Sequence, residues 1–171
     1  MQTNRADTKT TPQLGRYEID TGGSAVTFRT RHLFGLVPVR GTFAIRTAAI
    51  GIAEPLSRSS IRVEIEATSF QSGNEQRDAS VRSGRFLDAG RYPVLTFTSG
   101  ELDRAVINGM LTVRDVTRPV SLAIEETAAS PRSFTARATT RIDRTDFGLV
   151  AARGLAGRYL DLSMEVRCVR K

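Results

Sequence analysis

Apolar and polar residues alternate along most of this chain, with the period of two that is typical of half-buried β-strands. In residues 160–168, every even position is apolar and every odd position is polar. The same alternation predicts strands at 24–31, 37–46, 61–67, 120–126 and 134–142. Shorter candidates fill the gaps at 16–20, 94–99, 101–107 and 109–114. Gly, Pro, Asn or Asp separates most of these segments, as expected for turns.

Many short strands, each with one apolar and one polar face, favour a closed architecture. An antiparallel meander can close into a barrel, whereas an open sheet of this size would leave exposed edges. We therefore predict an all-β fold, an antiparallel barrel closed from a meander of short strands. Residues 16–171 are assigned to this barrel domain, and the polar residues 1–15 to a flexible N-terminal tail.

One stretch, residues 74–90, lacks the alternation. Asn74 or Asp78 could cap the start of a helix, and Gly90 lies where a helix would end. Val81, Phe86 and Leu87 would then form its dry side. We predict a short helix that covers one mouth of the barrel, with an ordinary long loop as the alternative.

The net charge of +7 raises the question of an anionic partner. Binding to nucleic acid or to an anionic membrane usually needs clustered basic residues. The arginines are dispersed among apolar residues, so we interpret most of them as solvated outer positions and predict no nucleic-acid binding. A basic module that docks on anionic membrane or nucleic acid is the alternative. Residues 1–15 contain no signal-like apolar run, so a cytoplasmic location is expected, although a chain that had lost a signal would look the same.

Residues that carry common catalytic chemistry are scarce. His32 is the one histidine, and we interpret it as a structural residue, not as part of a catalytic triad. Cys168 is the one cysteine, and its place on an apolar strand face predicts a buried thiol. One His and one distant Cys do not supply a metal site. We therefore predict no metal, no cofactor and no enzymatic activity, with an enzyme acting on an apolar substrate inside the barrel as the alternative.

Nine short motifs run in order along the chain, and their joint order and spacing are specific. They are YEID at 17–20, SAVTF at 24–28, VRGTF at 39–43, RD at 77–78, RFLD at 85–88, YPVLTF at 92–97, NGMLTV at 108–113, VTRPV at 116–120 and RTDFG at 144–148. Together they resemble the YceI family of polyisoprenoid-binding, lipocalin-like proteins, and His32 falls where that family often has a histidine. Two features depart from the family: Tyr17 stands where many members have Trp, and no secretory signal is visible.

The resemblance implies an extended, lipocalin-like barrel of eight antiparallel strands that encloses a polyisoprenoid chain in an apolar tunnel. A barrel of eight strands has an interior just wide enough for side chains or one slim ligand. A solid core filled by the same side chains is the alternative, because the alternation fits both. Strand parity predicts which residues would line the tunnel, and Phe86 would plug one end. The predicted ligand-binding residues are Val26, Phe28, Phe43, Ile45, Val63, Ile65, Phe86, Phe97, Leu111, Val113, Leu122, Ile124, Phe134, Leu162 and Met164.

The function implied by the resemblance is binding, storage or transport of a long-chain apolar lipid, either a polyisoprenoid or an isoprenoid quinone. Scavenging of lipophilic small molecules is a related reading. We interpret Arg77, Asp78, Arg144 and Asp146 as structural residues that pin the helix and the 144–148 turn through charge-assisted hydrogen bonds. Contact of Arg77 or Arg144 with a lipid headgroup is the alternative. A transient membrane contact and a homodimer are left open.

Overall fold

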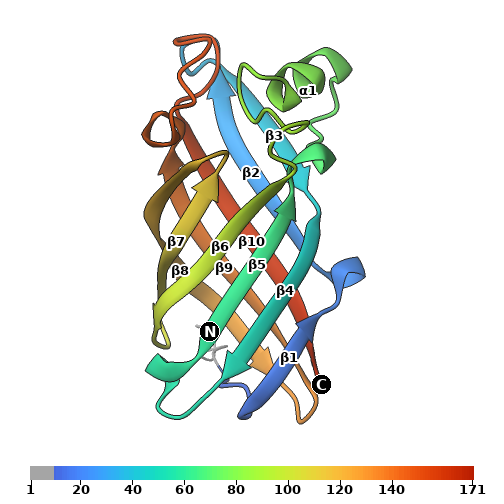
Figure 1. Ribbon diagram of the computed structural model, residues 1–171, viewed down its shortest axis with the longest axis vertical. Coiled ribbons are helices and arrows are strands. Elements are labelled where there is room, and N and C mark those ends of the chain that lie inside the picture. Colours follow the sequence, from blue (N-terminus) through green and yellow to red (C-terminus); the bar gives the residue numbers. More distant parts are fainter. Residues whose placement is uncertain (1–9) are drawn as a thin grey trace, which may run out of the picture.

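The computed structural model describes residues 10–171, and their strands form one antiparallel sheet that closes on itself (Figure 1). The strands are β1 (Gly15–Ile19), β2 (Ala25–His32), β3 (Val37–Phe43), β4 (Ile45–Ile52), β5 (Ser60–Glu66), β6 (Val94–Leu102), β7 (Val106–Val113), β8 (Val116–Ala129), β9 (Ser133–Asp143) and β10 (Tyr159–Arg170). A single α-helix of the described chain, α1 (Glu75–Arg82), lies between β5 and β6. The predicted all-β class is therefore confirmed.

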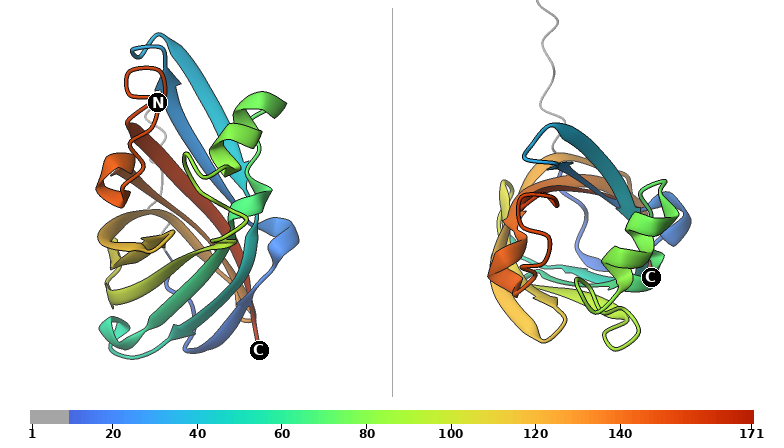
Figure 2. Two further views of the ribbon diagram at one scale, coloured as in Figure 1. Left: turned by 45° about the horizontal axis from the view of Figure 1, so that its top comes forward. Right: turned by 90° about the horizontal axis from the view of Figure 1, so that it is seen from above.

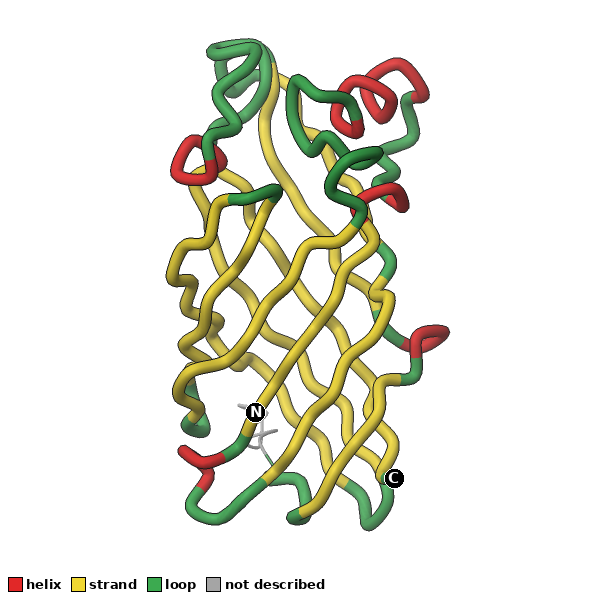
Figure 3. Tube along the Cα trace, in the orientation of Figure 1, coloured by secondary structure: helices red, strands yellow, loops and turns green. Residues whose placement is uncertain are grey.

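Eight of these strands form the closed ring. Its order is β1-β4-β5-β6-β7-β8-β9-β10, and β10 closes it by pairing with β1. β2 continues from β1 along the same edge of β10, and β3 pairs with β2. The β2–β3 hairpin thereby lengthens the barrel at the end drawn uppermost in Figures 1 and 3, which we call the upper end. The prediction of an extended eight-stranded antiparallel barrel is confirmed.

Two of the predicted strands need correction. The predicted strand 37–46 is interrupted at Ala44, whose amide donates to the Ser69 hydroxyl oxygen over 2.8 Å, and the chain then continues as β4 to Ile52. The predicted strand 101–107 is interrupted by a hairpin turn at residues 103–105, between the end of β6 at Leu102 and the start of β7 at Val106. One carboxylate oxygen of Asp103 accepts hydrogen bonds from the amides of Ala105 (2.7 Å) and Val106 (2.8 Å), which is the way Asp closes a turn.

The short helix predicted within 74–90 is confirmed as α1, which lies at the upper rim of the barrel (Figure 2). Asn74 is its N-cap, since its side chain accepts a hydrogen bond from the Arg77 amide over 3.0 Å. The helix ends at Arg82 and not near Gly90. Phe86 and Leu87 are consequently not on its dry side; they lie in the segment after it, where both are buried.

Tyr17, the residue that stands where many family members have Trp, is almost completely buried. Its ring packs edge-on against Phe134 with 4.9 Å between ring centroids, and its hydroxyl donates to the carbonyl oxygen of Gln13 over 2.8 Å. A buried phenol needs such a partner for its O–H group. The tyrosine therefore fills this aromatic position without leaving a polar atom unpaired.

The predicted tail, residues 1–15, falls mostly on residues 1–9, which lie outside the described chain. Within the described part, the Thr10 amide donates to the Thr127 carbonyl oxygen over 2.9 Å. The Thr10 hydroxyl accepts from the Ala129 amide over 2.7 Å. β1 begins at Gly15. Residues 10–14 thus lead into the first strand from a point that is bonded to β8.

Candidate functional site

The interior of the barrel contains two apolar cavities, one above the other. The upper cavity has a volume of about 520 Å³ and lies under α1 and the upper loops. The lower cavity has a volume of about 160 Å³ and lies between the lower halves of the strands. Val26 and Ile65 line both cavities, so these two side chains stand where the upper cavity meets the lower one.

The fourteen side chains that strand parity selected, and Phe86, all lie on the walls of these cavities. The lower cavity is lined by Val26, Ile45, Val63, Ile65, Phe97, Leu122, Ile124, Phe134 and Met164. The upper cavity is lined by Val26, Phe28, Phe43, Ile65, Phe86, Leu111, Val113 and Leu162. The barrel is therefore not a fully solid core. That these residues contact a ligand stays a prediction.

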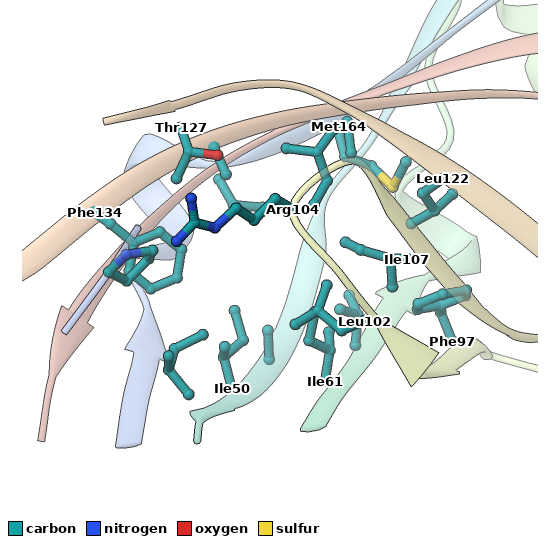
Figure 4. Close-up of a pocket in the computed structure, with 18 of the residues that line it drawn as sticks. Ile50, Ile61, Phe97, Leu102, Arg104, Ile107, Leu122, Thr127, Phe134 and Met164 are labelled. Carbon is teal, nitrogen blue, oxygen red and sulfur yellow. The ribbon is translucent and has the colours of Figure 1, made fainter. Parts of the chain in front are cut away.

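Figure 4 shows how side chains from several strands converge on the lower cavity. Ile50, Ile61, Leu102 and Ile107 point toward the same space as Leu122 and Met164. The Arg104 side chain extends among them, with its guanidinium toward Phe134 and Thr127. Walls of this kind favour apolar ligand surface by about 25 cal/mol for each Å² removed from water.

Sequence reasoning missed part of the lower wall. Ile50 and Ile52 are buried wall residues of β4, but the predicted strand stopped at residue 46. The signal was present, because Ala48, Ile50 and Ile52 alternate with period two. Between Ile45 and Thr47, the pairing of β4 with β5 is irregular, and the inward positions of β4 shift from odd to even. This shift hid the continuation of the strand beyond residue 46.

The upper cavity has a polar side that is made by His32, Arg77 and Arg144. Arg144 is buried, with 5% of its surface exposed. Its guanidinium donates to the carbonyl oxygens of Leu149 (2.6 Å), Gly157 (2.8 Å) and Ala156 (3.3 Å). The same group lies 5.5 Å from the centre of the Phe86 ring. Arg144 thus ties the loop before β10 to the barrel, which agrees with the structural role predicted for it.

Arg77 and Asp78 act together on the start of α1. Arg77 Nε donates to the Ser72 hydroxyl oxygen over 2.8 Å, and a terminal nitrogen of the same guanidinium donates to the Ser72 carbonyl oxygen over 2.9 Å. Asp78 accepts from both the hydroxyl and the amide of Ser72. The prediction that this pair pins the helix agrees with these bonds.

The carboxylate that pins the 144–148 turn belongs to Asp143, so the prediction was wrong for Asp146. Asp143 accepts from the Thr145 hydroxyl (2.6 Å) and amide (2.9 Å) and from Arg158 (2.9 Å). These bonds, led by the Thr145 hydroxyl, hold the pKa of Asp143 below its ordinary value. Asp146 is exposed, and its main-chain carbonyl oxygen accepts from Arg118 over 3.1 Å.

The two side chains with the greatest catalytic potential, His32 and Cys168, are uncharged at neutral pH. Burial lowers the pKa of His32, and the positive charges of Arg77 and Arg144 lower it further, so the imidazole is neutral at neutral pH. Burial raises the pKa of the Cys168 thiol to about 12, and the side chain has no exposed surface, as predicted. The reactive species of cysteine is the thiolate, which such a thiol does not form at neutral pH.

Two further features of residues 10–171 bear on chemistry and location. No group of three or more His, Cys, Asp or Glu side chains converges there as the ligands of a metal ion would. None of the helices in this range has the length and apolar character needed to cross a membrane. The expectations of no metal, no cofactor and a cytoplasmic location stay predictions.

The closed ring, its helix at one rim and its internal cavities define a lipocalin-like barrel. The sequence model of the YceI-like domain matches residues 17–168, and the chain therefore belongs to the YceI family. A UPF0312 protein of Vibrio parahaemolyticus is 29% identical over 175 residues, with 93% of this chain and 89% of that protein covered. A UPF0312 protein of Shewanella sp. strain W3-18-1 is 30% identical over 169 residues, with 91% and 87% covered.

Solved structures show the same fold at lower identity. BcnA of Burkholderia cenocepacia superposes with a TM-score of 0.76 and 19% identity, over 87% of this chain and 98% of that one. A polyisoprenoid-binding domain from Saccharophagus degradans, implicated in plant cell wall breakdown, superposes with a TM-score of 0.73 and 14% identity, over 93% and 100%. The fold predicted from the resemblance is thus that of its solved relatives.

Proposed function

We propose that this protein binds one long-chain apolar lipid, a polyisoprenoid or an isoprenoid quinone, along the axis of the barrel. The observation that carries the proposal is the pair of apolar cavities that meet at Val26 and Ile65. The upper one alone, at about 520 Å³, has the size of an ordinary small-molecule pocket. The Saccharophagus degradans relative, described as polyisoprenoid-binding, supports the same ligand class.

The arrangement favours an extended ligand with one polar end. The lower cavity is lined mainly by aliphatic and aromatic side chains, which suit an isoprenoid tail because such a tail offers almost no hydrogen bonds. His32, Arg77 and Arg144 border the upper cavity, where a quinone ring or another head could lie beside them. Pockets of this kind bind mainly by apolar burial and use a few polar groups to set orientation.

Binding, with storage or transport as its purpose, fits this interior better than catalysis. The neutral His32 and the protonated Cys168 offer neither a charged acid nor a thiolate at neutral pH. Nucleic-acid binding is also not expected. Several outer arginines are paired with carboxylates, including Arg141 with Asp161 at 2.8 Å and Arg158 with Asp143 at 2.9 Å, and a paired arginine offers less to a phosphate.

Lipid extraction tests the proposal directly. Purified protein is extracted with organic solvent, and the extract is analysed by mass spectrometry beside an extract of the Ile124→Arg variant. Ile124 lines the lower cavity, whereas the neighbouring Ala123 is exposed, so Ala123→Arg is the matched control. We expect a prenyl lipid in the wild type and the control and much less in Ile124→Arg. Equal lipid in all three samples, or a titration in which a fluorescent prenyl analogue fails to bind, would contradict the proposal.

A further inference from the structure

The upper rim of the barrel carries an exposed apolar patch on two loops. The backbone amides of Leu33 and Phe34 donate to the carbonyl oxygens of Leu155 and Gly154 over 2.9 and 2.8 Å, so the β2–β3 loop and the loop before β10 lie side by side at the top of Figure 1. Five of the large apolar side chains exposed on these loops and at the start of β3 form what we call the rim patch: Leu33, Phe34, Leu36, Val37 and Leu155.

The backbone of the rim patch holds these side chains outward at a conformational cost. Phe34 and Leu36 are 82% and 80% exposed, which is unusual for residues of this size. Leu33 and Phe34 have φ angles of 50° and 58°, a left-handed conformation that such residues rarely adopt. Gly154 lies directly under the Phe34 ring, since a Cβ at Gly154 would come within 2.6 Å of a ring carbon. Strain that is held in place at an exposed apolar site points to function.

The two chain segments that carry the rim patch contain basic residues and no acidic ones. Residues 29–40 and 147–158, which include both loops, contain five arginines and no Asp or Glu. Arg31 and Arg153 are exposed, and within residues 10–171 neither forms an ion pair. Exposed apolar side chains flanked by unpaired arginines match the chemistry of an anionic lipid bilayer, in which apolar groups insert between acyl chains and arginines meet headgroups.

The rim patch is also continuous with the upper cavity. Leu33, Val37 and Leu155 line that cavity as well as the rim. We propose that the rim patch docks on an anionic membrane, so that the upper mouth of the barrel opens against the bilayer and lipid passes between bilayer and cavity. The passage of lipid rests on the proposed function, whereas the docking itself does not.

Vesicle co-sedimentation tests the docking. Wild-type protein is spun with phosphatidylcholine vesicles that either contain or lack phosphatidylglycerol. We expect binding to the anionic vesicles, and a loss of at least about tenfold in the double variant Phe34→Ser/Leu36→Ser, because two inserting side chains are removed. Arg31→Gln/Arg153→Gln should weaken binding by about fivefold for each arginine, on anionic vesicles only.

The matched control is Met110→Ser/Val169→Ser, which removes two apolar side chains of 44% and 43% exposure outside the rim. We expect this variant to sediment like the wild type, and all variants to keep the wild-type melting temperature. Docking is overturned if wild-type protein does not bind anionic vesicles, or if the control variant loses as much binding as the rim variant. It is also overturned if ultracentrifugation shows a wild-type dimer that Phe34→Ser/Leu36→Ser converts to a monomer, because the rim patch would then be the interface between two copies of the chain.

A titration without vesicles separates this inference from the proposed function. A prenyl analogue added from solution should bind the Phe34→Ser/Leu36→Ser variant with the affinity of the wild type, because the cavity is intact. Vesicle binding without any binding of the analogue would leave docking standing and defeat the lipid-binding function. Analogue binding without vesicle binding would defeat the docking and leave the lipid-binding function standing.

Discussion

The two ends of the barrel interior offer a ligand different surroundings. The upper cavity holds about 520 Å³, has His32, Arg77 and Arg144 on its wall, and lies beneath loops with an exposed apolar rim. The lower cavity holds about 160 Å³, is lined mainly by aliphatic and aromatic side chains, and is bordered by Arg104 and by residues 10–12. For the proposed ligand, the difference predicts a direction: the head of an amphipathic lipid lies in the larger upper cavity beside His32, Arg77 and Arg144, and its tail lies in the smaller lower cavity.

The largest expected effect is at the upper end, where Arg144 holds the loop before β10. Replacing it in Arg144→Met leaves three carbonyl oxygens without their donor, and we expect the free energy of unfolding to fall by about 3 kcal/mol or more, measured by urea denaturation. Arg141→Met is the control, because Arg141 is exposed and pairs with Asp161 on the outer face. We expect no measurable change from it. Equal losses would show that Arg144 does not organise the upper end.

The next effect concerns the lower cavity. The variant Ile124→Trp places a bulky ring where the tail of the ligand would lie. We expect it to weaken the binding of a long prenyl analogue by about tenfold, because each excluded CH₂ is worth about 0.8 kcal/mol. A short analogue, held in the upper cavity, should bind as it does to the wild type. Fluorescence titration with both analogues measures the difference.

Ala123→Trp, on the exposed outer face of β8, is the control for this change. It should alter neither affinity. The proposed direction of the ligand is wrong if Ile124→Trp weakens both analogues equally, or weakens only the short one.

The sequence predicted the walls of the cavities better than their ends. Strand parity selects inward residues because successive side chains in a strand point to opposite faces, and this local rule holds for β10 from Leu160 to Cys168. It fails at Ala44, where the chain leaves β3, and at Asp103, whose side chain closes a turn inside an apparently apolar run. Both departures depend on side-chain hydrogen bonds to backbone amides, which interrupt an otherwise regular pattern.

The contacts that hold the loops at the upper end were not predicted, and the reason is different. Arg144 bonds to carbonyl oxygens of Leu149, Ala156 and Gly157, and their positions depend on a loop whose path has no period in the sequence. The contact of Phe34 with Gly154 joins segments that lie far apart in the chain. Such contacts are set by tertiary packing, which alternation does not encode. The family resemblance supplied the overall barrel but not these bonds.

A smaller effect is expected at the lower mouth, where Thr10 is bonded to β8. The variant Thr10→Val keeps the shape of the side chain and removes the hydroxyl that accepts from the Ala129 amide over 2.7 Å. We expect a loss of about 1 kcal/mol in the free energy of unfolding and faster dissociation of a long prenyl analogue, measured by stopped-flow fluorescence. Thr11→Val is the control, because Thr11 borders the same cavity without such a bond in the described chain. Identical dissociation rates in the two variants would argue against a role of Thr10 in closing this end.

The smallest effect is a pH dependence at the upper end, and it comes from His32. Burial and the charges of Arg77 and Arg144 lower its pKa below the ordinary value of 6.5. As the pH falls through about 6.5, the unfolded chain therefore binds a proton before the folded protein does, so the free energy of unfolding decreases. The decrease stops once the pH has passed the lower, folded-state pKa of His32.

His32 is the one histidine of the chain, so its contribution can be isolated. Urea denaturation at a series of pH values between about 7.5 and 5.5 should show a shallow loss of stability in the wild type and a flatter profile in His32→Gln. Protonation would also place a third positive charge beside Arg77 and Arg144, which disfavours a neutral ligand head in the upper cavity. The affinity of a prenyl analogue with a neutral head should accordingly fall in the wild type as the pH passes through the lowered, folded-state pKa of His32, and stay constant in His32→Gln. A parallel fall in both proteins would assign the pH dependence to other groups and remove His32 from the polar side of the site.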